Sequence, residues 1–303
     1  MDERAMKYIV AISKHQNLTK AAEALYVGQP TLSKFLAEIE TRLGLKLFRR
    51  VGHRYVPTYA GERYIEHSRE ILRMIDSLNA ELADIQKQNT GTVNITFANM
   101  RCSYMLPVLL PAFRNIYPNV KVNIFEGSSD ENDRRLLDGL IELAFYTMPS
   151  EPDPRIEYIP LAQEELLICA PHGHPLRECA QANPGGRYPS MDLKRVQSEL
   201  VLMMQPSQRT RQIVDSILRE NGIRLENVLY TSNIHAIMGL VSAGYGISFV
   251  FDSHLKHRAD SAPVDCYSIG NPGTVYDFVA AKRRGSYLSR YAADFIETVR
   301  HFV

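Results

Sequence analysis

The first sixty residues show three stretches with apolar positions at helical spacing. Apolar side chains at positions 6, 9, 10 and 12 outline a first amphipathic helix, and an alanine-rich second helix follows over residues 19–25. A break at residues 27–30 separates it from a third helix, because glycine relieves a turn and proline is accepted in a first helical turn. Apolar residues share one face of this third helix before Gly44 ends it: Leu32, Leu36, Ile39 and Leu43. The two closely joined helices must cross at a steep angle.

The opposite face of the third helix is small and polar at its N-terminal end and carries one cation. Such a helix end can enter a DNA major groove and offer amides and short side chains to bases and phosphates. Residues 47–58 then predict two short strands around Gly52, a basic hairpin that can contact phosphate. The predicted DNA contacts are Gln29, Pro30, Thr31, Ser33, Lys34, Arg50, His53 and Arg54. A small helical bundle with a solvated basic loop is the alternative.

Residues 59–90 predict one long helix that begins after Thr58, a candidate N-cap. Its apolar positions recur at heptad spacing, with Ser68 the polar exception, and such a seam favours a partner helix. Packing on the chain's own body is the alternative. The predicted dimer contacts are Tyr64, Ile71, Ile75, Leu78, Leu82 and Ile85.

From residue 92 onward, short apolar runs typical of strands alternate with helical patterns. The first strands lie in residues 93–97, 120–127 and 141–147, with helical stretches between them. Further strands are expected at 164–171, 199–204, 228–233, 246–251 and 274–282, and helices at 209–222, 235–244 and 289–302. This alternation is typical of an α/β fold.

Charge is distributed unevenly along the 303 residues. The net charge is +1, but residues 1–58 hold ten Lys or Arg and five Asp or Glu, a net of +5. Residues 59–303 hold 25 basic and 29 acidic groups, a net of −4. A basic head on a mildly acidic body is what a DNA-binding protein would show.

Composition and the N-terminus indicate a cytoplasmic protein. No apolar run approaches the ~20 residues that span a bilayer, and the N-terminus lacks the apolar core of a signal peptide. The four cysteines show no paired spacing, so reduced, buried thiols are expected. A redox sensor using Cys169 and Cys179 is the alternative.

The segment NLTKAAEALYVGQPTLSKFLAEIETRLGLKLFRRVGHRYVPTYAG closely resembles the winged helix-turn-helix of the LysR-type transcriptional regulators. Its AA-x-x-L, Q-P-x-L-S, I-E-x-x-L-G and L-F-x-R elements stand in the family's order and spacing. Gly28, where the family usually has Ser, and His53, often Arg, are departures. The body resembles the family's effector domain in MLPVLLPAFRNIYPNVKVNIFEG, DGLIELAFYT, HGHPL and LVSAGYGISFV.

The resemblance implies an α/β chain with three parts. These are a winged helix-turn-helix head rich in helix (1–58), a linker helix through which members pair (59–90), and a periplasmic-binding-protein-like effector domain (91–303). The effector domain would have two lobes, the first at 91–162 with 268–303 and the second at 163–267.

An effector would then lie between the lobes, where four strand-to-helix junctions converge. Helix N-termini and hydroxyls favour anions, and Arg101 and Arg209 add cations, so a small carboxylate or similar anion is expected. The family often has Ser or Thr where Ala98 and Met100 stand, a departure for which Arg101 could compensate. The candidate contacts are Ala98, Asn99, Met100, Arg101, Cys102, Ser103, Tyr146, Thr147, Gln205, Ser207, Gln208, Arg209, Ser232 and Asn233.

No grouping of residues typical of catalysis is present. His172 and His174 lie in a proline-flanked turn and are expected to be solvated rather than metal ligands. We therefore expect no catalytic residue, no metal and no cofactor, and a homodimeric or homotetrameric regulator that binds a palindromic, promoter-proximal DNA site and a small effector. RNA polymerase is a further candidate partner. The competing hypotheses are a solute-binding module with an interaction helix and no DNA role, and an enzyme of unknown type.

Overall fold

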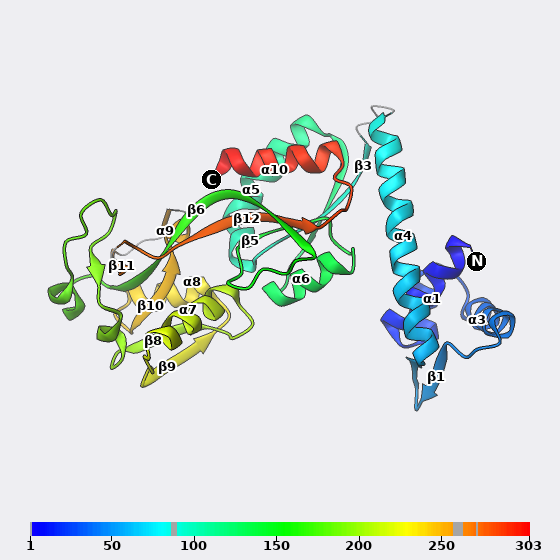
Figure 1. Cartoon of the computed structure of the whole chain (residues 1–303), viewed down its shortest axis with the longest axis horizontal. Coiled ribbons are helices and arrows are strands. Elements are labelled where there is room, and N and C mark those ends of the chain that lie inside the picture. Colours follow the sequence, from blue (N-terminus) through cyan, green and yellow to red (C-terminus); the bar gives the residue numbers. More distant parts are fainter. Residues whose placement is uncertain (1, 86–89, 257–262, 271) are drawn as a thin grey trace. The chain divides into compact units, whose positions relative to one another are not determined.

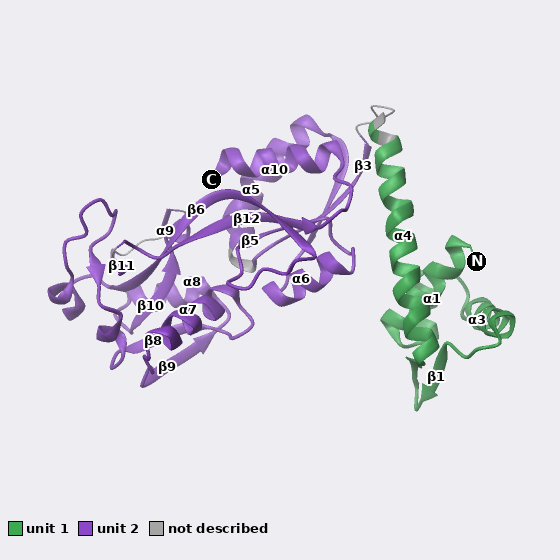
Figure 2. Ribbon diagram, viewed as in Figure 1, with its two compact units in different colours: residues 1–88 green, residues 89–303 purple. Residues whose placement is uncertain are grey.

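The computed structural model describes residues 2–85, 90–256, 263–270 and 272–303, without the side chains of residues 83, 85, 99 and 100. It divides into two compact units, residues 1–88 and 89–303 (Figure 2). We call them the head and the body; Figure 1 labels their helices and strands. None of the helices described combines the length and the apolar character needed to cross a membrane.

The head consists of three short helices, a hairpin and one long helix. Its elements are α1 (Glu3–His15), α2 (Leu18–Ala24), α3 (Gln29–Leu43), β1 (Phe48–Val51), β2 (Arg54–Pro57) and α4 (Tyr59–Ile85). Asp2 and Asn17 cap α1 and α2 through their side chains, whereas Gly28, the N-cap of α3, offers none. Gly44 ends α3 and Gly52 turns the hairpin, both at positive φ, as predicted.

The core of the head lies between α1, α2, α3 and the first turns of α4. Ile9, Ile12 and Leu32 are completely buried there. Leu36 and Ile39 are also buried, but Leu43, expected on the same face, is 38% exposed because α3 ends beyond the core.

The start of α4 is locked to the segment before the hairpin. Thr58 accepts a hydrogen bond from the Gly61 N–H and donates one to the Lys46 carbonyl. Gly61 packs so closely there that a Cβ atom would lie 1.9 Å from the Leu47 carbonyl oxygen. Only glycine fits this approach, so α4 leaves the head at a fixed point.

The body alternates strands and helices. Its elements up to the middle of the chain are β3 (Thr90–Phe97), α5 (Asn99–Ile116), β4 (Asn119–Phe125), α6 (Ser129–Leu137), β5 (Leu143–Thr147) and β6 (Ile156–Pro171). Those that follow are η1 (Pro175–Cys179), β7 (Ser190–Met191), η2 (Leu193–Val196), β8 (Leu200–Met204), α7 (Arg209–Glu220) and β9 (Asn227–Thr231). The last are α8 (Ile234–Ser242), β10 (Ile247–Phe251), α9 (Asp252–Lys256), β11 (Val264–Ile269), β12 (Val275–Arg283) and α10 (Arg290–Phe302).

The body's strands form one sheet with two halves that share β6. The strand order is β4-β3-β5-β12-β6-β10-β8-β9, and β11 pairs with β6 and β7. Residues 156–165 of β6 pair with β12, and residues 166–171 pair with β10 and β11. We call the half around β3, β4, β5 and β12 lobe I, and the half around β8 to β11 lobe II.

Each lobe has helices on both faces of its sheet. In lobe I, α5 and α10 pack over one face and α6 over the other. In lobe II, α7 contributes to the apolar cluster on one face and α8 to the cluster on the other (Figure 1). Parallel pairing in each lobe carries the strand ends that precede α5, α7 and α8 toward the same region.

The β6 strand differs most from its prediction. It begins eight residues earlier than the predicted strand at 164–171. Pro160 lies inside it, where a register shift opposite Phe278 and Val279 forms a bulge. A bulge tolerates the missing proline N–H, so a strand continues through a sequence that argues against one. Its change of partner falls between Glu165 and Leu166, slightly later than the lobe boundary expected at 162/163.

The second lobe boundary also lies later than expected. β11 reaches Ile269 while still paired with β6 in lobe II, so lobe I resumes after residue 269 rather than at 268. β11 itself was not predicted, because its polar residues interrupt the apolar pattern.

Candidate functional site

The exposed face of α3 carries the residues predicted to contact DNA. Gln29, Pro30, Thr31 and Lys34 are exposed and Ser33 is half-buried. The Lys34 side chain is 80% exposed, and its Nζ lies 3.9 Å from a Glu38 oxygen. A contact this long between exposed groups is weak, so the ammonium can pair with another anion.

The β1–β2 hairpin presents a second group of cations. Arg49, Arg50, His53 and Arg54 are all exposed on it. The hairpin is held to the head at two places: Tyr55 N–H donates to the Gln16 carbonyl at 2.9 Å, and Glu40 binds its start. These basic side chains therefore stand on a fixed backbone.

Glu40 is a buried carboxylate whose role the sequence does not reveal. It is 7% exposed, and its Oε1 accepts from the N–H groups of Leu47 and Phe48 at 2.9 and 3.2 Å. Its Oε2 pairs with the Lys46 Nζ at 2.7 Å. It thereby ties the C-terminal half of α3 to β1, which keeps the helix and the hairpin in one geometry.

Tyr26 is a further candidate functional residue, which the sequence pattern did not identify. It lies in the turn between α2 and α3, has φ 55° and is 96% exposed. A non-glycine residue in this conformation is strained, and strain of this kind is found at functional positions. A sequence signal was available, since a large aromatic residue rarely suits a tight turn.

The apolar positions along α4 lie in two different environments. Tyr64 packs against the head's own core, and Ser68, the polar exception, is 3% exposed. Farther along, Ile71 and Ile75 are half-buried, and Leu78 and Leu82 are 54% and 46% exposed. The Ile85 side chain lies outside the described residues. The first part of the predicted dimer seam therefore packs inside the head, and the exposed stripe extends to an additional residue, Met74, which is 71% exposed.

The centre of the body's candidate site is a buried ion pair. The Arg101 Nη2 lies 2.7 and 2.6 Å from the two oxygens of Glu164, and the side chains are 3% and 2% exposed. The same nitrogen donates to Thr147, and the guanidinium lies over the Phe278 ring at 4.1 Å. Burial alone would lower the pKa of Arg101, but the Glu164 charge and hydrogen bonds outweigh it, so the pKa is raised. Arg101 is therefore a charged structural residue already satisfied by Glu164, not the open cation that was expected.

The second expected cation is also paired. The Arg209 Nη2 donates to Asp133 at 2.9 Å, and the same carboxylate accepts from the Tyr146 hydroxyl at 2.6 Å. Burial, together with the Asp133 charge, raises the pKa of Tyr146 and keeps it protonated. Unlike Arg101, Arg209 keeps its buried Nε without a hydrogen-bond partner among the described residues.

The four predicted junctions do converge. Thr147 meets Arg101 at 3.2 Å, Tyr146 lies beneath Arg209, and Ser103 lies 3.2 Å from the Nε2 of His235, just after Asn233. Gln212 of α7 also reaches Asp130 of α6 at 3.1 Å. The sequence identified the junctions but missed the carboxylates that neutralise them, because Asp130, Asp133 and Glu164 lie outside the junction segments.

The remaining candidates have mixed positions. Asn233 caps α8, while Gln205, Ser207 and Ser232 are exposed and Gln208 is half-buried. Gln208 is the N-cap of α7, and its side chain makes no capping hydrogen bond.

At the first junction, Ala98 is half-buried and the side chains of Asn99 and Met100 lie outside the described residues. The Cys102 thiol lies in the core, 3.8 Å from the Phe97 carbonyl oxygen, and burial raises its pKa to about 11. Cys102 therefore faces away from any ligand between the lobes.

In the histidine turn, His172 is exposed as predicted, whereas His174 is half-buried. His172 lies 3.0 Å from Asp265, and His174 lies 3.7 Å from Glu199. Within the described part of the chain, no group of three or more His, Cys, Asp or Glu is placed to hold a metal ion.

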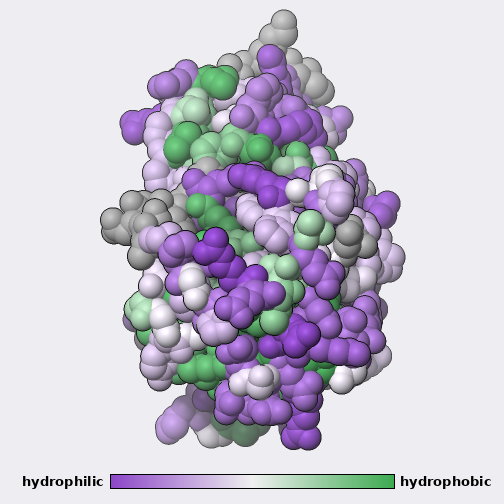
Figure 3. Space-filling model, turned by 90° about the vertical axis from the view of Figure 1, so that its left-hand side faces the viewer, coloured by the Kyte–Doolittle hydropathy of each residue, from purple (hydrophilic) through white to green (hydrophobic). Residues whose placement is uncertain are grey.

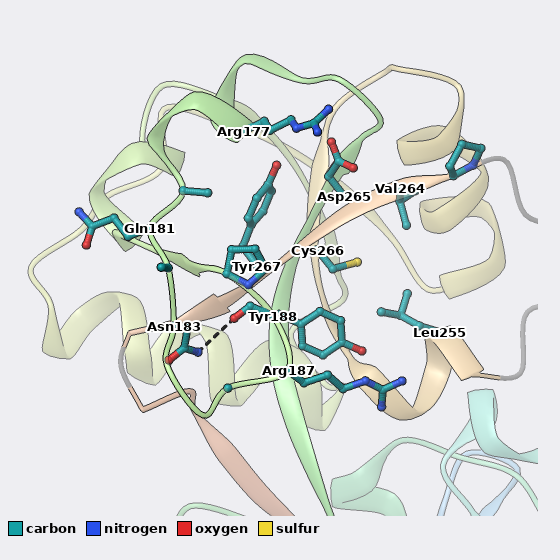
Figure 4. A pocket seen from close by; sticks show the side chains of 15 residues that line it. Arg177, Gln181, Asn183, Arg187, Tyr188, Leu255, Val264, Asp265, Cys266 and Tyr267 are labelled. Atoms are coloured by element: carbon teal, nitrogen blue, oxygen red, sulfur yellow. Dashed lines mark hydrogen bonds between the residues drawn. The ribbon is translucent and has the colours of Figure 1, made fainter.

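A cavity of about 1050 Å³ lies in lobe II, away from the four junctions (Figure 4). It is bounded by residues 177–189 and by β11, including Tyr188, Cys266 and Tyr267. No sequence pattern indicated it, since its two walls are about eighty residues apart in the chain.

Comparison with known proteins identifies both units. Residues 86–303 match the family model described as LysR substrate binding domain. Residues 4–62 match the model described as bacterial regulatory helix-turn-helix protein, lysR family.

Individual relatives match most or nearly all of the chain. The HTH-type transcriptional regulator YcgK of Bacillus subtilis (strain 168), itself uncharacterized, is 28% identical over 310 residues, covering 99% of this chain and 94% of the relative. The transcriptional activator CmpR of Synechocystis sp. (strain ATCC 27184 / PCC 6803 / Kazusa) is 28% identical, covering 79% and 75%.

Solved structures share the fold. A full-length OxyR variant from Pseudomonas aeruginosa has a TM-score of 0.75 at 21% identity, covering 99% of this chain and 95% of that one. CbnR complexed with its target DNA has a TM-score of 0.61 at 22% identity, with full coverage of both chains. The predicted α/β fold with a helix-turn-helix head is confirmed.

The buried ion pair leads to a stability prediction. Replacing Glu164 by Gln or Arg101 by Met leaves one charge or donor buried without its partner, and should lower the free energy of unfolding by about 3–5 kcal/mol. The double variant Arg101→Met/Glu164→Met should recover much of this loss. Urea unfolding followed by circular dichroism measures each change.

The matched control is the surface pair of the exposed Arg155 and the half-buried Asp153, 2.7 Å apart. Arg155→Met should cost less than about 1 kcal/mol. Equal losses at Arg101 and Arg155 would contradict the structural role of the buried pair.

Proposed function

The chain belongs to the LysR family of DNA-binding transcriptional regulators, and on this premise we propose that it binds duplex DNA as a homo-oligomer under the control of a small anionic effector. Its named relatives are transcriptional regulators, and the chain acts without catalytic activity or cofactor. Its place is the cytoplasm, where bacterial DNA lies, and RNA polymerase is a candidate partner at a promoter-proximal site.

The observation that carries the DNA-binding proposal is the exposed face of α3 beside the basic hairpin. Among the described residues, Lys34 is held only by a long contact to Glu38, so it can neutralise a phosphate at little cost. Gln29, Pro30, Thr31 and Ser33 stand at the leading end of the helix, where short side chains reach base edges. Arg50, His53 and Arg54 add phosphate contacts from the hairpin.

A second copy of the chain is the proposed occupant of the exposed α4 stripe. Met74, Leu78 and Leu82 would remain exposed to water in a single chain. Burying the apolar surface of such side chains is favourable by about 25 cal/mol per Å². Two heads joined through α4 would present two α3 helices to a palindromic site.

The proposed effector site lies where the junctions of lobes I and II meet. Arg209 is the cation that an anionic ligand would contact, because its Nε still has no partner among the described residues. Arg101 contributes indirectly, by keeping the first junction in place. An anion at Arg209 would compete with Asp133 and so change the contact between the lobes, which biases one arrangement over another.

Lys34→Ala should weaken binding to duplex DNA about tenfold, or ~1.4 kcal/mol, by removing one charged contact. If that contact is to phosphate, the loss should be the same for all sequences, and the slope of log K against log salt should fall by about 0.9. Fluorescence anisotropy over a salt series measures both quantities.

Lys121→Ala is the control, because Lys121 is an exposed lysine on β4 of the body. It should leave affinity and slope unchanged. If the wild-type chain binds no duplex, or binds with no salt dependence, a solute-binding module with an interaction helix becomes the better interpretation.

Leu78→Asp should dissociate the oligomer, because it removes apolar burial and places a charge in the seam of both copies. We expect the dissociation constant to rise at least about 30-fold, or ~2 kcal/mol. Ala80→Asp adds the same charge on another face of α4 and should have little effect. Sedimentation equilibrium decides, and equal behaviour of the two variants would disprove pairing through this stripe.

Arg209→Gln should weaken the binding of small organic acids about tenfold, since it removes a charged donor. Asp133→Asn should strengthen binding, because it removes the competing carboxylate. Arg219→Gln, an exposed change at the other end of α7, is the matched control.

Isothermal titration calorimetry with a panel of mono- and dicarboxylic acids measures these affinities. If no acid binds the wild-type protein while neutral or cationic metabolites do, the anionic effector is wrong. Unchanged affinity in Arg209→Gln would place the ligand elsewhere.

A further inference from the structure

Cys169 and Cys266 lie directly opposite each other on neighbouring strands of lobe II. Cys169 is on β6 and Cys266 on β11, in antiparallel register, with their sulfurs 3.0 Å apart. Both are reduced in the structure. Cys179, the partner considered from sequence, packs with the apolar cluster on the other face of the sheet, so it cannot pair with Cys169.

The register of the two strands favours a bond between these sulfurs. The Ser268 N–H donates to the Pro189 carbonyl at 2.8 Å, on the side of β11 away from β6. Backbone groups two residues apart point the same way, so those of Cys266 also point away from β6. Cys169 and Cys266 thus form a non-hydrogen-bonded pair, in which Cα atoms are about 4.5 Å apart, within the ~4.4–6.8 Å range of disulfides.

The two thiols differ in access. Cys169 is completely buried, whereas Cys266 is half-buried and lines the cavity of about 1050 Å³. Figure 4 shows the Cys266 sulfur in the wall of this cavity, between Tyr188 and Val264. A reagent in the cavity would meet Cys266 first, and Cys169 would be in position to resolve the product.

The chemistry of the cavity favours a small acidic peptide. Arg177 and Arg187 line it on opposite sides of Cys266 in Figure 4, and Asn183 and Gln181 add polar groups. The outward backbone groups of Val264 and Cys266 have no strand beside them in the described residues, since the pairing of β11 with β7 involves Ser268 and Ile269. An extended peptide can hydrogen-bond to such an edge, while arginines bind its carboxylates.

Figure 3 shows the hydropathy of one face of the molecule. Hydrophilic side chains predominate on this face, with smaller hydrophobic areas between them. The cavity volume is in the range of small-molecule sites, about 300–1,000 Å³ or slightly above.

We propose that Cys169 and Cys266 form a reversible disulfide by exchange with a small acidic peptide disulfide of the glutathione type. The Cys266 thiolate attacks one sulfur of the small disulfide, forming a mixed disulfide and releasing one small thiolate. The Cys169 thiolate then attacks the Cys266 sulfur and releases the second small thiolate. Two protein thiols are oxidised, one small disulfide is reduced to two thiols, and the two protons pass to the released thiolates.

The bond would join β6 to β11 and close a loop between positions 97 residues apart. A loop this long strongly restricts the unfolded chain, so the oxidised protein should melt at a higher temperature than the reduced one. In a reducing compartment such a bond is transient. It would therefore act as a regulatory signal that is separate from effector binding. The inference does not depend on DNA binding.

The test uses full-length reduced protein and oxidised glutathione. Titration under denaturing conditions should show the four thiols of the chain falling to two. Mass spectrometry of unreduced peptides should identify a link between Cys169 and Cys266 in the wild type. The double variant Cys102→Ser/Cys179→Ser should form the same link.

Two single variants test the order of attack. Cys169→Ala should stop at a mixed disulfide between glutathione and Cys266. Cys266→Ala should leave Cys169 unmodified, because no other path to it is open. The mass-spectrometric search for the Cys169–Cys266 link uses the wild-type protein. It therefore tests the proposed disulfide even if one of these variants fails to fold.

The cavity's charge is tested separately. Arg177→Gln/Arg187→Gln should slow the reaction with oxidised glutathione about tenfold but leave the reaction with neutral 2-hydroxyethyl disulfide unchanged. No link in the wild type, or a link through Cys102 or Cys179, would overturn the proposal. So would equal rates of the wild type and the double arginine variant with oxidised glutathione.

Discussion

The arrangement of the body depends on the ion pair between Arg101 and Glu164, because neither charge can be left alone in the interior. Arg101 lies in the first turn of α5 in lobe I, and Glu164 lies on β6 just before that strand enters lobe II. Thr147, at the end of β5, bonds to Arg101, and Ser253 of α9 in lobe II donates to Glu164 at 2.8 Å. A single carboxylate thus connects two junctions of lobe I with a helix of lobe II. Any ligand between the lobes acts on a framework that this pair holds.

A buried carboxylate also connects separate segments in the head. Glu40 is also a buried carboxylate, and it binds backbone N–H groups of the segment that leads into the hairpin. Gly61 lets α4 start directly against the same segment. The exposed groups of α3 and the hairpin therefore belong to one rigid surface, whereas the far part of α4 leaves its apolar stripe uncovered. A subunit that binds one DNA half-site as part of a dimer needs contact groups on a rigid backbone and an exposed surface for pairing with the second subunit.

The sulfur pair and the effector junctions occupy different parts of the body but share β6. This strand carries Glu164 at the crossing between the lobes and Cys169 within lobe II. Pro160 and its bulge lie just before the crossing, where a straight strand would otherwise be expected. One strand thus carries these features at the point where the sheet passes from lobe I to lobe II. A disulfide and an effector would consequently act on neighbouring segments of the same backbone.

Sequence alone determined what local physics controls: the helices of the head, the end of the third helix at Gly44, the turn at Gly52 and the alternating elements of the body. It also identified the exposed face of α3 and the strand-to-helix junctions, because helical periodicity and the order of strands and helices can be read from neighbouring residues. Tertiary structure decided which charges meet. Arg101 and Arg209 look like open cations until folding brings Glu164 and Asp133 from distant segments to within hydrogen-bonding distance. The same holds for Cys169, whose neighbour is set by the register of β6 and β11 across 97 residues. Long-range pairing of this kind has no local signal, because it arises only when strands and helices far apart in sequence pack together.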